Sequence, residues 1–188
     1  MFLVVGLGNT GSCYAETRHN VGFMVVDEFC NRLNSSFSYR EDISSFCTGG
    51  EKVIVIKPAT WINLSGEAVK RAVSVFSPEE IILVHDDIYI PLGRLKIKKG
   101  GGDGGHKGVR SVIQHIGKDF VRIKIGIGKP DGDIISYVLG EFTREEKTVI
   151  KRVIDVAVYA ILDIVENGLS YAMNKYNPPL EAKEDEGV

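Results

Sequence analysis

The sequence predicts an α/β fold, a single-domain sandwich in which helices flank a twisted, mixed and largely parallel central sheet. Three observations lead to this prediction. Short apolar segments of strand length alternate along the chain with longer segments whose apolar residues recur at helical spacing. The 188 residues, of which 44% are hydrophobic, suffice for one sizeable core. Some links between strands are too short for a crossover helix, which predicts antiparallel pairs at the edges of the sheet.

Six segments have the apolar content and the length of strands. Gly49-Gly50 joins the second segment to the third, and the short link 88–92 lies between the fourth and the fifth. These links predict the antiparallel edges, whereas the helical segments between the other strands predict parallel neighbours. The predicted strands are 2–6, 44–48, 52–57, 80–85, 93–98 and 120–127.

Four segments keep a helical spacing of apolar residues over ten or more positions, and a shorter one follows them. The predicted helices are 21–34, 65–76, 108–117, 143–166 and 169–175. Residues suited to helix ends stand at several of their boundaries. These residues are Asn20 as the N-cap of the first helix, Ser65 with Glu67 at the start of the second, Thr143 with Glu146 as a capping box for the fourth, and Gly168 at its end.

Composition divides the chain into a globular domain, 1–178, and a short acidic tail, 179–188. Residues 181–188 hold four acids against one lysine, and we expect this tail to be disordered. The sequence has no run of 18 apolar residues and leaves no room for a signal peptide before the first strand, so we expect no membrane segment. The three cysteines are odd in number and form no C-x-x-C pair, which predicts reduced thiols and a cytoplasmic location.

Residues 6–11 read Gly-Leu-Gly-Asn-Thr-Gly and match the dinucleotide-binding pattern G-x-G-x-x-G. Such a fold needs a helix that starts at the glycines and an acidic residue at the end of the next strand. Here the helical pattern begins only at Val21, and the acidic residue at about the right distance falls inside that helix. We therefore interpret the glycines as shaping a long loop that presents Asn9, Tyr14 and His19, and we expect no cofactor.

Ligands of α/β proteins bind beyond the carboxyl ends of the strands, and four polar loops are predicted there. The loops are 7–20, 58–65, 85–92 and 100–108. The candidate side chains in them are His19, His85, His106, Asn9, Asn63 and Asp86. Asparagines and a carboxylate at neighbouring strand ends favour a shared site with a histidine. His115, in contrast, falls within a predicted helix, and we expect it to be structural.

The spacing of residues disfavours three other kinds of site. No His-x-x-x-His pair occurs and the cysteines are scattered, so no metal is expected. No G-x-S-x-G elbow occurs, which disfavours a serine triad. The glycine-rich loop 100–108 is not a P-loop, because Lys107 is followed by Gly108 and not by Ser or Thr. Its glycines instead predict a close approach of the backbone to a large ligand.

Basic residues gather in the stretch 94–124, which carries nine lysines and arginines but only two acids. A local excess of this size indicates a polyanionic partner such as a nucleic acid. A solvated strand face would give the same pattern, and the composition of the stretch leaves both interpretations open. The basic residues are Arg94, Lys96, Lys98, Lys99, Lys107, Arg110, Lys118, Arg122 and Lys124.

Four separated segments together resemble the bacterial-type peptidyl-tRNA hydrolase family. They are VVGLGNTGSCYAETRHNVGFMVVD, KPATWINLSGEAV, LVHDDIYIPLGRLKIKKGGGDGGHKGVRS and RIKIGIGKP, and they match in order and spacing up to about Asn174. The resemblance implies an enzyme that hydrolyses the ester between a peptide, or an N-blocked amino acid, and tRNA, which frees tRNA for reuse in translation. It also implies a monomer that contacts the acceptor stem and 3′ end of peptidyl-tRNA and needs neither a metal nor a membrane.

The resemblance implies roles for individual residues. His19 corresponds to the general base that activates water, and Asp86 to the carboxylate that orients this base. Asn9 and Asn63 correspond to asparagines that bind the peptide. The other residues implied to bind substrate or tRNA are Tyr14, Trp61, Lys107, His106, Lys96, Lys98, Lys99, Arg110 and Lys124.

The sequence departs from the family at one substrate-binding position. The glycine loop of the family reads Gly-Gly-His-Asn-Gly, whereas this chain has Lys107 in place of the asparagine. Lysine only donates hydrogen bonds and adds a charge, whereas asparagine also accepts. The alternative function is therefore a non-catalytic RNA-binding homologue of the same fold. The joint presence of His19, Asp86 and both asparagines argues against it, since a binder needs none of them.

Overall fold

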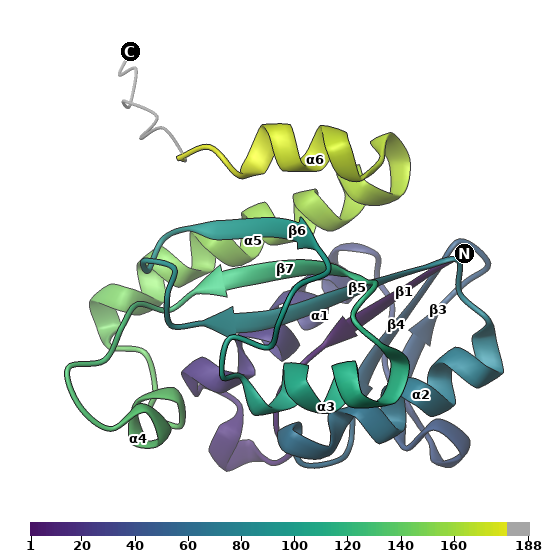
Figure 1. Cartoon of the computed structure of the whole chain (residues 1–188), viewed down its shortest axis with the longest axis horizontal. Coiled ribbons are helices and arrows are strands. Elements are labelled where there is room, and N and C mark those ends of the chain that lie inside the picture. Colours follow the sequence, from purple (N-terminus) through teal and green to yellow (C-terminus); the bar gives the residue numbers. More distant parts are fainter. Residues whose placement is uncertain (180–188) are drawn as a thin grey trace.

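A seven-stranded mixed sheet forms the centre of the molecule (Figure 1). The computed structural model describes residues 1–179, in which the strand order is β2-β3-β4-β1-β5-β7-β6. The strands are β1 (Phe2–Gly6), β2 (Ser38–Arg40), β3 (Ser45–Gly49), β4 (Val53–Pro58), β5 (Glu80–Asp87), β6 (Leu95–Lys99) and β7 (Val121–Gly126). The four strands β4, β1, β5 and β7 run parallel, whereas β2 with β3 and β3 with β4, and β6 with β7, pair antiparallel. The predicted mixed, largely parallel sheet is therefore confirmed.

Helices cover both faces of this sheet and make a three-layer sandwich (Figure 1). The helices are α1 (Val21–Arg32), α2 (Ser65–Phe76), α3 (Lys107–Ile116), α4 (Ile134–Val138), α5 (Arg144–Asn167) and α6 (Leu169–Tyr176). α1, α5 and α6 pack over one face, around Val84 and Ile123. α2 and α3 pack over the other face, around Leu83 and Phe120. The successive residues Leu83 and Val84 thus enter different cores, because side chains along a strand alternate between its faces.

The central strand β1 reads as a continuous apolar run because both of its faces are covered. Leu3, Val4 and Val5 are fully buried. Leu3 and Val5 join the core under α2 and α3, and Val4 joins the core under α1 and α5. Burial of each such side chain stabilises the fold by about 1.5–3 kcal/mol, which fixes β1 as the rigid support of the loop that follows it.

The glycines at the start of the 6–11 motif serve helix packing. A Cβ atom on Gly6 would lie 2.5 Å from the carbonyl oxygen of Gly22 in α1, and one on Gly22 would lie 2.4 Å from that of Val84. The absence of side chains at both positions therefore lets α1 lie directly on β1 and β5. The helix begins at Val21, as the sequence predicts, and so it does not start at the glycines as it would in a dinucleotide-binding fold.

The predicted ends of α5 are confirmed, and Asn20 stands at the N-cap position of α1, as predicted, but without a side-chain bond to the helix. Thr143 and Glu146 form a reciprocal capping box, and Gly168 ends α5 with a φ of 87°. The Asn20 side chain does not cap α1. It donates to the Asn9 carbonyl at 2.8 Å and accepts from the Asn9 amide at 2.9 Å. Because both of its polar atoms bond the loop backbone, Asn20 closes the 7–20 loop instead of satisfying the helix.

The structure contains two short elements that the sequence pattern does not predict. β2 has three residues, none buried, so it lacks the apolar signal of a strand. α4 has five residues and follows Asp133, whose side chain accepts the Ser136 amide at 2.7 Å. A single turn is too short to display a helical stripe of apolar residues. Ser65 is the first residue of α2, but its hydroxyl donates to the Ile62 carbonyl at 2.8 Å and does not cap the helix.

The link 88–92 does not join neighbouring strands, contrary to the prediction. β7 lies between β5 and β6, parallel to the first and antiparallel to the second. The edge is antiparallel as predicted, but its partner comes later in the chain. β6 alternates buried with charged positions, which suits an edge strand, whereas β7 is buried along nearly its whole length and needs a neighbour on each side.

The glycine loop reaches the site from the far end of the sheet. β6 is antiparallel, so its carboxyl end at Lys99 lies opposite the carboxyl ends of the parallel strands. This corrects the expectation that the loop 100–108 follows a strand that ends at the site. Arg122, a buried residue of β7, donates to the carbonyls of Gly101 and Gly102 and holds the loop on its way back to α3.

No helix within residues 1–179 is long and apolar enough to cross a membrane. The acidic tail predicted for 179–188 lies outside the described residues, apart from Pro179. The division of the chain into a domain and a tail therefore stays a prediction.

Candidate active site

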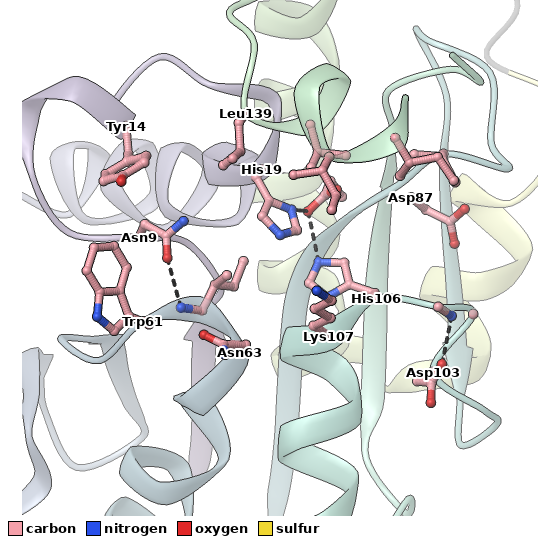
Figure 2. Close-up of a pocket in the computed structure, with 18 of the residues that line it drawn as sticks. Asn9, Tyr14, His19, Trp61, Asn63, Asp87, Asp103, His106, Lys107 and Leu139 are labelled. Carbon is pink, nitrogen blue, oxygen red and sulfur yellow. Dashed lines mark hydrogen bonds and ion pairs between the residues drawn. The ribbon is translucent and has the colours of Figure 1, made fainter. Parts of the chain in front are cut away.

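A pocket of about 360 Å³ opens beyond the carboxyl ends of β1 and β5. Figure 2 shows that side chains from well-separated parts of the chain surround it. Each of the four predicted loops contributes, through residues such as Asn9, Trp61, Asp86 and His106. The structure thus brings the predicted loops together, and α4 adds a side that the sequence does not predict.

The buried carboxylate of Asp86 contacts two imidazole rings. Its Oδ1 lies 2.9 Å from Nδ1 of His19 and 2.9 Å from Nε2 of His106, and Figure 2 shows the two rings side by side. The other ring nitrogen of His106 accepts the Val109 amide at 3.2 Å, which makes His106 the N-cap of α3. From this network we assign the His106 proton to Nε2 and the His19 proton to Nδ1, so that both rings donate to Asp86.

This assignment leaves Nε2 of His19 as an unprotonated nitrogen. The side chain of His19 is 14% exposed and lines the pocket. It comes from a 3₁₀ turn, Arg18–Asn20, at the end of the loop that follows β1. A neutral imidazole whose second nitrogen is held by a carboxylate can take a proton from a water molecule in the pocket.

Asp86 is ionised in the folded protein. Its side chain is 3% exposed, and burial on its own raises the pKa of the carboxyl. The nearby His106, together with the hydrogen bonds from His106 and His19, outweighs burial and brings the pKa of Asp86 well below its usual range. The carboxylate can therefore stabilise a positive charge that develops on His19.

A third histidine packs against this pair. His85 is buried and makes an edge-to-face contact with the His106 ring, with ring centroids 5.0 Å apart. Its Nδ1 donates to the Asp86 carbonyl at 2.7 Å. Burial and the neighbouring His106 lower the pKa of His85 to about 3, so this ring stays neutral. His85 satisfies the end of β5 and supports His106 from below the pocket.

Asn9 is buried beside the pocket, whereas the sequence predicts an exposed residue. Its Oδ1 accepts the Ile62 amide at 2.8 Å, which connects the loop after β1 to the loop after β4. With the oxygen occupied, Nδ2 is the group that can donate into the pocket. Figure 2 shows this nitrogen on the side of Asn9 that faces His19.

Two aromatic rings stand at the mouth of the pocket. Tyr14 and Trp61 make an edge-to-face contact with ring centroids 6.0 Å apart, as Figure 2 illustrates. Trp61 is 58% exposed, which is unusual for so large an apolar ring and leaves its surface open to stacking. Asn63, two residues further along the chain, lines the same pocket.

A further part of the pocket lining is apolar, and its residues are absent from the site predicted from the sequence. Ile134, Ile135, Val138 and Leu139 form this α4 wall. Ile134 and Ile135 are about half exposed, so they offer contact surface to a ligand. The local sign of this wall is Asp133, a residue suited to cap a helix, because the five residues of α4 are too few to show a helical stripe.

Lys107 is the first residue of α3, and its exposed side chain lines the pocket. Asp103 in the same loop accepts the Gly105 amide at 2.7 Å and pairs with Arg110 at 3.0 Å. Arg110, predicted to contact tRNA, is thus already next to a carboxylate. Lys107 has no carboxylate partner within residues 1–179.

The basic stretch is not one uniform surface. Arg122 is buried, and desolvation lowers the pKa of its guanidinium from the usual arginine value. Its position beneath the glycine loop makes it a structural residue, which corrects its place in the predicted basic surface. Lys99 and Lys124 are each paired with a carboxylate of β5, at 2.8 Å and 2.5 Å. Lys96 and Lys98 of β6 have no carboxylate partner in the described part of the chain.

His19, Asp86 and His106 also form a group whose ligand atoms lie within 4.8 Å of one another, a spacing that could hold a metal ion. The ring nitrogens concerned donate directly to the carboxylate, and both would have to lose their protons to bind a metal. The expectation that the site works without a metal stays a prediction.

A buried carboxylate, a histidine with an open nitrogen, amide donors and an apolar wall surround a single pocket. On a three-layer α/β/α sandwich, this combination of groups suits the hydrolase class of enzymes.

Comparison with known proteins gives the family. The family described as peptidyl-tRNA hydrolase matches residues 3–186. The chain is 49% identical to the peptidyl-tRNA hydrolase of Thermodesulfovibrio yellowstonii over 185 residues, which cover 94% of this chain and 99% of that protein. It is 43% identical to the peptidyl-tRNA hydrolase of Clostridium botulinum over 183 residues, 94% and 97% of the two chains. The crystal structure of peptidyl-tRNA hydrolase from Acinetobacter baumannii is similar, with a TM-score of 0.89, 33% identity and 95% coverage of each chain. This chain belongs to the peptidyl-tRNA hydrolase family.

Proposed function

We propose that this protein hydrolyses the ester bond between a peptide, or an N-blocked amino acid, and tRNA, and so releases free tRNA for reuse in translation. The observation that carries the proposal is the 2.9 Å contact between Nδ1 of His19 and the buried Asp86 carboxylate. It supports a general base beside a pocket large enough for the end of a peptidyl-tRNA. Membership of the family supports the same substrate.

His19 acts as the base. Its Nε2 takes a proton from water as the water oxygen attacks the ester carbonyl. The tetrahedral intermediate then collapses, the bond to the terminal ribose oxygen breaks, and the imidazolium returns the proton to that oxygen. A base of this kind contributes on the order of 10²–10⁴ in rate, which suffices because esters are activated compared with amides.

Asp86 acts through His19. It fixes the proton of the ring on Nδ1 and stabilises the imidazolium as it forms. His106 donates to the same oxygen at 2.9 Å and is itself fixed as the N-cap of α3. The carboxylate is therefore held on two sides, and its direction toward His19 does not depend on one hydrogen bond alone.

Two asparagines and two aromatic rings bind the substrate. Nδ2 of Asn9 donates to the peptide backbone in a pocket that accommodates a blocked amino group better than a free α-ammonium. The side-chain amide of Asn63 and loop N–H groups donate to the developing oxyanion. Trp61 and Tyr14 offer stacking surfaces for the end of the tRNA.

The tRNA phosphates contact basic side chains outside the pocket. Lys96 and Lys98 are the strongest candidates, because they lack carboxylate partners within residues 1–179. Contacts to phosphate give affinity without reading sequence, which suits an enzyme that must accept every tRNA. Lys99, Lys124 and Arg110 take part if their ion pairs open. A monomer in a reducing, cytoplasmic setting belongs to the same proposal, and all three cysteines are free thiols.

Lys107 favours a second candidate, an RNA-binding homologue without hydrolysis. Its side chain lines the pocket where the family has an asparagine. The deciding experiment offers the purified protein one tRNA esterified either with an N-acetylated or with a free amino acid. The first proposal predicts rapid release of the N-acetyl-amino acid and slow release of the free one. Tight tRNA binding without cleavage of either ester would favour the RNA-binding homologue.

A further inference from the structure

Arg18, which precedes His19 in the chain, is an almost completely buried arginine. Its side chain is 9% exposed, and its Nη2 lies 2.6 Å from Oε2 of Glu146 in α5. Its guanidinium also stacks over two rings, with centroids 4.4 Å away for Tyr137 and 5.3 Å for Phe142. The proposed mechanism does not use this charge, and burial of a charge is costly unless the charge is paired and hydrogen-bonded.

The side chain and the backbone amide of Arg18 both reach one segment, from the end of α4 to the start of α5. Its backbone amide donates to the Gly140 carbonyl at 2.9 Å, and the preceding Thr17 forms an antiparallel bridge with Glu141. Its Nη1 donates to the Tyr137 carbonyl at 3.4 Å, at the carboxyl end of α4. A cation at this end of a helix is electrostatically favourable. The His19 loop and this segment are therefore joined by backbone and side chain together.

The ion pair between Arg18 and Glu146 also anchors the first turn of α5. Oε2 of Glu146 accepts the Thr143 amide at 2.7 Å as part of the capping box, and the same oxygen accepts from Arg18. The guanidinium thus touches the end of α4 and the start of α5 at once. It spans the connection 139–143, which is the short stretch that fixes α4 relative to the rest of the fold.

α4 depends on such contacts for its position. It has five residues, and an isolated helix of that length is not stable in water. Its other anchor is the Tyr137 hydroxyl, which donates to the Ile127 carbonyl at 2.5 Å. Both anchors hold α4 at Tyr137, and the apolar side chains of the α4 wall line the pocket.

We propose that Arg18 is a positioning residue that fixes the α4 wall relative to His19, and that through this wall it sets a preference for esters of amino acids with apolar side chains. The inference rests on the proposed function, and it extends that function to the side-chain subsite. An apolar side chain packed on the wall brings the ester carbonyl to a fixed distance from His19. A glycine ester lacks this contact and gains nothing from the wall.

The test compares two esters on the same tRNA, N-acetyl-leucine and N-acetyl-glycine, with wild-type protein and the Arg18→Lys variant. Lysine keeps the charge but loses the planar fork that bonds Tyr137 and Glu146 together. Wild type should prefer the leucyl ester in kcat/KM by about tenfold or more, the size expected for a methylene-rich side chain in an apolar subsite. Arg18→Lys should reduce this preference to less than about threefold, mainly by slowing the leucyl ester.

The matched control is Arg32→Lys. Arg32 also links its element to α5, through Asp155, and also stacks on a tyrosine, but it lies away from the pocket. The Arg32→Lys variant should leave the preference for the leucyl ester over the glycyl ester unchanged. If Arg18→Lys lowers kcat/KM for both esters by the same factor, or leaves the preference of wild type intact, Arg18 is structural only and the proposal is wrong.

Hydrogen exchange keeps this test independent of the proposed function. The amides of Tyr137 and Leu139, which bond Asp133 and Ile135 within α4, should exchange at least tenfold faster in Arg18→Lys and at the wild-type rate in Arg32→Lys. Unchanged exchange in Arg18→Lys would overturn the positioning role. If wild type cleaved neither ester, the proposed function would be wrong, whereas the exchange rates would still decide whether Arg18 holds α4.

Discussion

Nδ1 of His19 lies 2.9 Å from Oδ1 of Asp86, although 67 positions separate the two residues in the chain. The contact exists because β1 and β5 are parallel neighbours, with Gly6 beside Val84, so the segments after both strands leave the sheet at the same edge. Both strands are buried over most of their length, and the proposed base and its carboxylate are therefore positioned before any substrate binds.

We expect Asp86→Asn to lower kcat on the order of a hundredfold or more, because the variant has no negative charge to stabilise the His19 imidazolium. Asp119→Asn is the matched control, since Asp119 is an exposed residue before β7. The measurement is the turnover of N-acetyl-aminoacyl-tRNA by the three proteins. An Asp86→Asn protein that folds and keeps more than about a third of the wild-type kcat would exclude this role.

The pH dependence of stability should contain a contribution from His85. Its pKa is about 3 in the folded protein and about 6.5 in an unfolded chain. Unfolding therefore takes up a proton below pH 6.5, so the contribution is complete above that pH and is lost as the pH falls. Between pH 7 and pH 5 it amounts to about 2 kcal/mol for a fully buried group.

Denaturant unfolding of wild type and His85→Gln at pH 7 and pH 5 measures this contribution. The variant should lose about 2 kcal/mol less of its free energy of unfolding over this interval than wild type does. His115→Gln, which changes a half-buried histidine on α3, serves as the control. Equal losses in wild type and His85→Gln would mean that His85 does not stay neutral in the fold.

Lys107→Asn should keep turnover within about tenfold of wild type, or ~1.4 kcal/mol in the barrier. Removal of the ammonium from the pocket makes protonation of His19 easier, so the acidic limb of the pH–rate profile should move to higher pH. The profile is recorded for both proteins on one N-acetyl-aminoacyl-tRNA. An acidic limb that does not move would remove Lys107 from the electrostatics of the site. A turnover of Lys107→Asn a hundredfold above that of wild type would instead favour the RNA-binding homologue.

Replacement of Lys96 and Lys98 by glutamine should weaken tRNA binding. The slope of log K for tRNA binding against log salt concentration should become shallower by roughly one unit for each phosphate that the variant no longer binds. Cleavage of a minimal peptidyl-adenosine, which lacks the acceptor stem, should be nearly unchanged. Lys52→Gln, at the exposed turn between β3 and β4, is the control. A salt slope equal to that of wild type would place the phosphate-binding side chains elsewhere, for example at Lys99 or Lys124.

The sequence predicts those parts of the molecule that carry a local signal. The apolar run at β1, the helical spacing after Val21 and the capping box at Thr143 each reflect contacts between near neighbours, and the structure contains all three elements. Asn20 has the residue type of a helix cap, but a partner in its own loop binds it more completely. A residue type therefore identifies what a side chain can bond, and the fold decides which partner it meets.

The parts that the sequence does not predict depend on contacts between distant segments. Nothing near Arg122 in the chain indicates that it is buried under a loop that comes some twenty residues earlier. α4 is too short for a periodic signal, and its role in the pocket becomes visible only because its residues line the same pocket as Trp61 and His19. The order of β7 and β6 likewise depends on which strand tolerates an exposed edge, a property of the finished sheet.

The most direct test of the central proposal is the rate at which His19→Ala releases an N-acetyl-amino acid from tRNA, relative to wild type. The release rate of the variant should be lower than that of wild type by two orders of magnitude or more, the range of a general base. Its circular dichroism and its affinity for tRNA should stay close to those of wild type. A folded His19→Ala protein that retains more than about a tenth of the wild-type turnover, less than ~1.4 kcal/mol of barrier, would contradict the assignment of His19 as the base.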